Sequence, residues 1–184
     1  MSVTKPGAAT GSGYGAMDKI LHWLIVALLA IQYVIGWTMP DIHRGTKPEG
    51  LIAWHLWFGA LLIIVIVIRI VWRLTHPVPL LSDGTPAWQN LLARLTHGLL
   101  YLTLVVVLGL GWANASARGY SVSLFGLIPL PPIMPEGSRP GMAAGDIHSF
   151  LGWCLLALIG LHLLAALYHY LILRDRVLQR MLPH

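Results

Sequence analysis

Nine histidines are unusual in this chain of 184 residues, because 57% of its residues are hydrophobic and only 10% are charged. Histidine binds metals and carries protons, and ionisable side chains inside a membrane are costly and usually functional. Six of the nine fall in or at the ends of long apolar stretches: His22, His55, His97, His148, His162 and His169. These six residues are therefore the first candidates for chemistry.

The histidine spacing in the last apolar stretch predicts two sites at different depths. His148 and His162 are 14 residues apart, close to four turns of an α-helix, so they share one face about 21 Å apart along the axis. His169 follows on the same face. Each site needs a partner at the same depth on another helix. We expect His55 to pair with His148 near the outer surface and His22 to pair with His162 near the inner surface.

Paired neutral imidazoles are axial ligands of haem iron. The only cysteine is Cys154, which excludes a C-x-x-C-H attachment site and makes any such haem a non-covalent, b-type group. Gly36, Gly59 and Gly152 follow the outer or inner histidines at helical spacings and would let a flat macrocycle lie against a helix. A proton relay of histidines is the main alternative. A zinc site is less favoured, because no carboxylate or thiol joins the cluster.

Four apolar stretches are long enough to place these histidines in a bilayer, since a spanning helix needs about 20 residues. They run over residues 20–39, 51–74, 91–113 and 147–173, with prolines in the connections. The expected fold is an all-α membrane protein, a four-helix transmembrane bundle over residues 17–184. Residues 1–16 are rich in Gly, Ala, Ser and Thr and are expected to form a flexible tail.

The distribution of basic residues predicts that both termini are cytoplasmic. Eight lysines and arginines fall on the side of the termini and four on the other, which the positive-inside rule assigns to the outside. The inner eight are Lys5, Lys19, Arg69, Arg73, Arg94, Arg174, Arg176 and Arg180, and the outer four are Arg44, Lys47, Arg118 and Arg139. This asymmetry accounts for the net charge of +5, so no nucleic-acid partner is expected.

The longest connection runs from about Asn114 to Asp146 on the outer side. It is rich in proline yet strongly apolar, as in the run SVSLFGLIPLPPIMP. A long connection of this kind is usually functional. We expect it to lie along the outer membrane surface as a cap.

The order of several short motifs resembles the bacterial cytochrome b561 family, whose members include a membrane superoxide oxidase. The shared features span residues 17 to 183: the pair His22–Trp23, His55, the run RLTHPVP with Arg69 before it, HGLLY from His97 to Tyr101, FGLIPLP, His148, GLH at His162, LLAALYH at His169, and RMLP. The resemblance implies four helices and two b-type haems, with His22, His55, His148 and His162 as ligands. It agrees with the pairing expected from depth.

Four further residues have both a functional and a structural interpretation. Arg69 shares the face of His55 at the inner end and would bind a haem propionate or anchor the helix in the headgroups. His97 and Tyr101, one turn apart, would bind a quinone or a propionate, or hydrogen-bond between helices. His169 is a candidate quinone contact or a surface histidine.

Two haems across a bilayer would conduct electrons. The chain has no flavin or nucleotide motif, so the redox chemistry would belong to the haem. The resemblance implies an inner-membrane oxidoreductase that takes electrons from periplasmic superoxide and passes them to ubiquinone. We expect Arg118 and Arg139 on the outer side to attract the anion. One alternative is a cytochrome b subunit of a hydrogenase or other dehydrogenase, fed by a redox partner protein. Another is a non-redox histidine channel.

Overall fold

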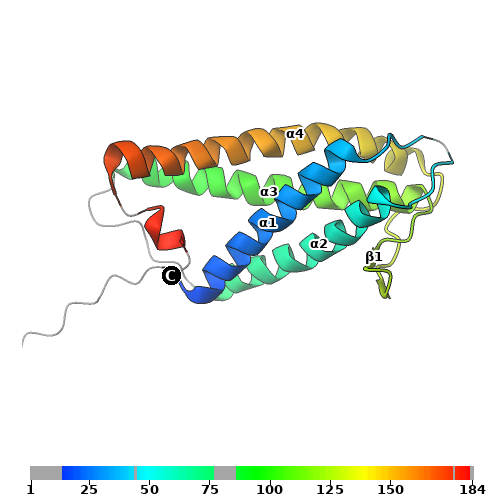
Figure 1. Ribbon diagram of the computed structural model, residues 1–184, viewed down its shortest axis with the longest axis horizontal. Helices are drawn as coiled ribbons and strands as arrows, with labels where there is room; N and C mark the ends of the chain where they lie inside the picture. The colour runs from blue at the N-terminus through cyan, green and yellow to red at the C-terminus, as the bar shows by residue number, and fades with distance from the viewer. Residues whose placement is uncertain (1–13, 44, 77–85, 176, 183–184) are drawn as a thin grey trace, which may run out of the picture.

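The computed structural model describes residues 14–43, 45–76, 86–175 and 177–182. The expected tail at 1–16 and the prolines of RLTHPVP fall largely or wholly outside these residues. Four long helices dominate the structure (Figure 1). They are α1 (Ala16–Thr38), α2 (Leu51–Thr75), α3 (Ala87–Ala117) and α4 (Arg139–Tyr168), and α4 continues into a π-helical turn, η1 (His169–Leu173). Each helix is long and apolar enough to cross a membrane. The expected four-span bundle is confirmed, and the chain is a multi-pass membrane protein.

The outer ends of α3 and α4 extend beyond the limits expected from hydropathy. Helix α3 continues four residues past Ala113, and α4 begins eight residues before Ile147. Asn114 explains part of the difference, because its side-chain amide donates to the carbonyls of Gly141 and Met142 and joins the two helix ends. At the start of α4, the Ser138 hydroxyl caps the helix by accepting from the Gly141 amide. The expected long connection is therefore limited to residues 118–138.

This outer connection forms a small hairpin that packs on α2. Strands β1 (Ser123–Leu124) and β2 (Ile128–Pro129) pair antiparallel. The turn between them has positive φ at Phe125 and Gly126, a conformation that glycine adopts readily. The Phe125 ring lies 6.3 Å from Trp57 and 5.9 Å from Phe58, measured between ring centroids. The hairpin thus covers the outer end of α2, as a cap.

The helices pack as two pairs, α1 with α2 and α3 with α4, as Figure 1 shows. A layer of buried leucines joins the pairs at mid-height. Leu62 is 1% exposed and Leu155 is 2% exposed, and Leu28 and Leu104 complete the layer. Most other apolar side chains of the spans face outward, as expected for helices surrounded by lipid. The two pairs therefore meet along a seam whose centre is closed by this leucine layer.

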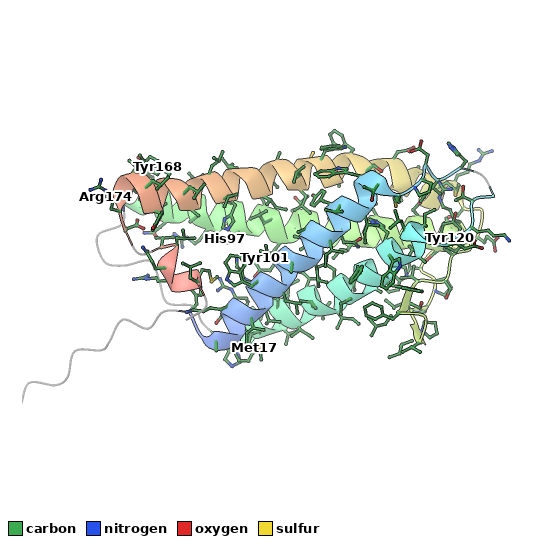
Figure 2. All side chains as sticks on the ribbon, viewed as in Figure 1. Met17, His97, Tyr101, Tyr120, Tyr168 and Arg174 are labelled. Atoms are coloured by element: carbon green, nitrogen blue, oxygen red, sulfur yellow. The ribbon has the colours of Figure 1, made fainter. Side chains whose placement is uncertain are left out.

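The inner and outer ends are assigned by charge. Figure 2 shows Tyr168 and Arg174 at one end of the bundle and Tyr120 at the other. We predict that a reporter fused after His184 is cytoplasmic and that one inserted at Ser138 is periplasmic, because eight of the twelve basic residues lie on the side of the termini. Paired alkaline phosphatase and fluorescent protein fusions measure this. A periplasmic C-terminus would exchange the inner and outer ends of the bundle.

Candidate haem sites

The candidate residues on α2 and α4 are spaced by multiples of seven, and on each helix a leucine of the buried layer lies midway between the outer and the inner candidate. On α4 the order is His148, Leu155, His162 and His169. On α2 Leu62 lies midway between His55 and Arg69. Seven residues are close to two helical turns, so each series keeps one face. The leucine layer therefore separates an outer group of histidines from an inner group.

The outer pair brings together α2 and α4. The ring centroids of His55 and His148 lie 6.1 Å apart with an interplanar angle of 86°. An iron ion about 2 Å from one nitrogen of each imidazole would separate two centroids by about 6 Å. The spacing therefore fits a bis-histidine haem. Both histidines were expected from the sequence to form this pair.

A hydrogen bond orients one of the two outer histidines, His148, for this role. His148 Nδ1 lies 2.8 Å from the Val107 carbonyl oxygen on α3, which leaves Nε2 for the pair. A backbone carbonyl bonded to the second nitrogen is the usual support of a metal-bound imidazole. His55 Nδ1 is buried and has no hydrogen-bond partner among the described residues. An unsatisfied buried imidazole is consistent with a site whose main ligand is a bound group.

A cavity of about 50 Å³ lies between these histidines. Gly59 and Gly111 line it from opposite helix pairs. A Cβ atom at Gly111 would lie 2.9 Å from His148 Cε1, so any larger residue at this position would displace the imidazole. A haem macrocycle is larger than the cavity, so the lining side chains would move apart on binding. Residues that line the cavity are Gln32, His55, Leu56, Gly59, Ile63, Leu108, Gly111, Trp112, Val122 and His148.

The three glycines predicted from the sequence to make room for a haem have different surroundings. A Cβ at Gly36 would lie 3.9 Å from His55 Cε1, and one at Gly59 would lie 3.2 Å from the Gln32 amide nitrogen. Gly152 instead contributes its carbonyl, which accepts a hydrogen bond from the Tyr33 hydroxyl at 2.7 Å. Gly111 lies on a third helix, outside the histidine series, and sequence spacing did not indicate it.

Three imidazoles meet at the inner level. The ring centroids of His22 and His162 lie 6.4 Å apart, at the distance expected across an iron ion, whereas those of His97 and His162 lie only 5.1 Å apart. His97 Nδ1 lies 2.6 Å from the carbonyl of Ala93. The longer distance favours His22 over His97 as the partner of His162. His97 is placed to contact a ligand beside them.

Arg69 is buried at the inner end of α2 rather than extended toward the headgroups. Its side chain is 9% exposed. The Nε group donates to the Tyr101 hydroxyl at 2.7 Å, and Nη1 donates to the Asp18 carbonyl at 3.2 Å. A buried cation is costly without a counter-charge. The fixed guanidinium is therefore well suited to bind a carboxylate such as a haem propionate.

Two further features lie toward the inner end. An apolar groove of about 340 Å³ runs between α2 and α3 and contains Tyr101. Its lining residues are Ile70, Arg73, Leu74, Tyr101, Leu102 and Val105. At the end of α4, His169 Nδ1 lies 2.5 Å from Asp175 Oδ2. Sequence reasoning chose His169 and Tyr101 but missed Asp175, six residues past His169 and just beyond the apolar stretch.

Comparison with known proteins gives one consistent result. A family model described as prokaryotic cytochrome b561 matches residues 13–184. Cytochrome b561 homolog 2 of Escherichia coli is 28% identical, over 94% of this chain and 93% of that protein. A probable superoxide oxidase CybB of Yersinia pestis is 29% identical, over 92% and 96% respectively. Cytochrome b562 of Cereibacter sphaeroides is 27% identical, over 92% and 95%.

Proposed function

The chain belongs to the prokaryotic cytochrome b561 family of b-type haem electron-transfer proteins, and we propose that it oxidises superoxide outside the inner membrane and reduces ubiquinone within it. The observation that carries the proposal is the presence of two histidine pairs on opposite sides of the leucine layer. The ring centroids lie 6.1 Å apart in the outer pair and 6.4 Å apart in the inner pair. The 29%-identical relative named a probable superoxide oxidase supports the choice of substrate.

The residues would divide the work by depth. Two bound haems would supply one-electron redox chemistry at the two levels. His55 and His148 would hold the outer group and His22 and His162 the inner group, while Arg69 would bind a propionate at the inner level. The overall reaction balances as two superoxide anions plus ubiquinone plus two protons, giving two molecules of oxygen and ubiquinol. The buried leucine layer lies between the two levels.

Basic side chains of the outer end would attract the anion. Arg139, at the first turn of α4, is exposed. Arg118 is half-buried, and it donates to Asn114 Oδ1 at 3.0 Å and to the His43 carbonyl at 3.4 Å. Arg118 therefore has a structural role as well as a charge. Arg139 is the cleaner probe of electrostatic attraction.

We expect superoxide to reduce the purified protein in stopped-flow measurements, and added ubiquinone to reoxidise it. Raising the salt concentration slows the first step, because salt screens attraction between exposed charges. Replacing Arg118 and Arg139 together by Gln slows the reduction by superoxide further. The single variant Arg139→Gln measures the effect of charge on this rate without the structural role of Arg118. Arg94→Gln is the matched control, since it removes the same charge from the inner side.

Two outcomes would contradict this function. Failure of superoxide to reduce the protein at any salt concentration, together with rapid reduction by a co-purifying dehydrogenase, would support a cytochrome b subunit of a hydrogenase or other dehydrogenase. A purified protein without the α band of reduced b-type haem would remove the redox interpretation in favour of a histidine channel.

A further inference from the structure

The chain reverses direction immediately after α4, around the backbone of His169. The five residues His169–Leu173 form the π-helical turn η1, and Arg174 then takes a left-handed conformation with φ of 52°. The amides of Arg174 and Asp175 both donate to the His169 carbonyl. π-Helical turns are rare and often occur at functional sites. This reversal brings Asp175 back to the His169 ring.

The returning segment is fixed at both ends. The Asp175 carboxylate contacts His169 through Oδ2 and accepts from the Val177 amide through Oδ1 at 3.0 Å. Further on, the 3₁₀ turn η2 (Gln179–Met181) reaches α1, where Trp23 Nε1 donates to the Met181 carbonyl at 2.8 Å. Figure 1 shows this segment turned back from the end of α4 toward α1. It lies at the end of the bundle that holds the inner histidines.

We propose that Asp175 positions His169, and that this pair delivers protons from the inner aqueous phase to the quinone reduced there. The proposal rests on the proposed function, in which two electrons reach each ubiquinone. Two protons must then be added to its oxygens to give ubiquinol. His169 would donate them from Nε2, one for each electron, and would regain each proton from water on the inner side.

The surroundings of the pair suit this role. His169 and Asp175 side chains are 19% and 37% exposed, so the pair connects the bundle with the inner boundary. Burial alone raises the pKa of the Asp175 carboxyl, but hydrogen bonds from His169 and the Val177 amide and the nearby charge of Arg180 lower that pKa on balance. Asp175 therefore stays ionised at neutral pH, and its carboxylate fixes the orientation of the His169 ring by accepting from Nδ1. Among the described residues, the charged or titratable groups that face the pair are Arg180 and Tyr168, and the Tyr168 ring lies 6.3 Å from that of His169.

The test measures quinone reduction separately from superoxide oxidation. Protein reduced with dithionite in nanodiscs is mixed with decylubiquinone, and haem reoxidation is followed from pH 6 to pH 9. For Asp175→Asn we expect about a ten-fold lower limiting rate at pH 8, with decylubiquinone affinity in a direct binding assay within about two-fold. The dependence of this rate on pH should also change, because the side chain that faces the His169 ring is no longer charged. Asp175→Glu restores most of the rate.

Controls separate the possible failures. Asp41→Asn removes the same charge from the exposed outer connection and should leave the rate and its pH profile unchanged. If Asp175→Asn kept the wild-type rate and pH profile, the role proposed for Asp175 and His169 would be wrong, and the proposed function would still stand. A wild-type protein that decylubiquinone does not reoxidise would instead overturn the proposed acceptor. Val105→Trp narrows the α2–α3 groove, and if it abolished binding while Asp175→Asn changed nothing, the quinone would bind in that groove.

Discussion

His148→Ala is expected to lower the haem content from two b-type haems per chain to one, and His162→Ala to do the same at the other level. Each change removes one of the two histidines that would hold the haem in a buried site, so the remaining histidine would have to hold the group alone. His55→Ala should match the first variant and His22→Ala the second. Pyridine haemochrome assays count the haem, which acid acetone extracts because no thioether bond holds it, and electron paramagnetic resonance reports the loss of each low-spin signal.

The inner level gives the most informative comparison, because three imidazoles meet there. His97→Ala should keep two low-spin haems, since the 5.1 Å centroid distance to His162 is too short for an iron ion between the rings. His43→Ala, on the exposed outer connection, serves as the general control. Loss of the inner haem in His97→Ala, with full occupancy in His22→Ala, would show that the ligand pairing is wrong.

Gly111→Ala should weaken haem binding at the outer site and leave the inner site unchanged. The added Cβ atom would lie 2.9 Å from Cε1 and 3.0 Å from Nδ1 of His148, closer than non-bonded atoms in contact allow. Forcing a methyl group into such a space costs about 1–3 kcal/mol, which lowers haem affinity by roughly five- to 150-fold. Haem titration of the purified variant, with separate optical spectra for the two sites, measures the difference.

Gly109→Ala is the matched control for this substitution. It makes the same change two residues away on α3, where a Cβ atom meets nothing within 4 Å among the described residues. Its haem content should equal that of the unchanged protein. Equal haem content in Gly111→Ala would mean that His148 moves freely, and its proposed fixed orientation toward the Val107 carbonyl would be wrong.

The four spans and the relative depths of the histidines could be predicted from the sequence, because both are properties of single helices. Hydropathy located the four helices, and seven-residue spacing placed His148, His162 and His169 on one face. Asn114 lies past the end of its apolar stretch, yet the helix continues through it because its amide bonds to α4. That contact joins residues 27 positions apart in the sequence, so hydropathy could not indicate it.

Three contacts could not be predicted for a related reason, because they depend on how α2, α3 and α4 are rotated against one another. They are the approach of Gly111 to His148, the bond between His148 and the Val107 carbonyl, and the choice of Arg69 as the hydrogen-bond partner of Tyr101. One sequence gives the faces of each helix but not these relative rotations. Asp175 was missed because it contacts His169 only after a π-helical turn and a left-handed residue reverse the chain.

Both proposed ligand pairs take one histidine from α4, which a ribosome makes after α1, α2 and α3. His22 and His55 lie on α1 and α2 and enter the membrane first, and their partners His162 and His148 follow on α4. A chain truncated before α4 would therefore have no closed pair at either level. Haem capture would then depend on synthesis of α4, and chains terminated before this helix would not retain a reactive iron porphyrin in the bilayer.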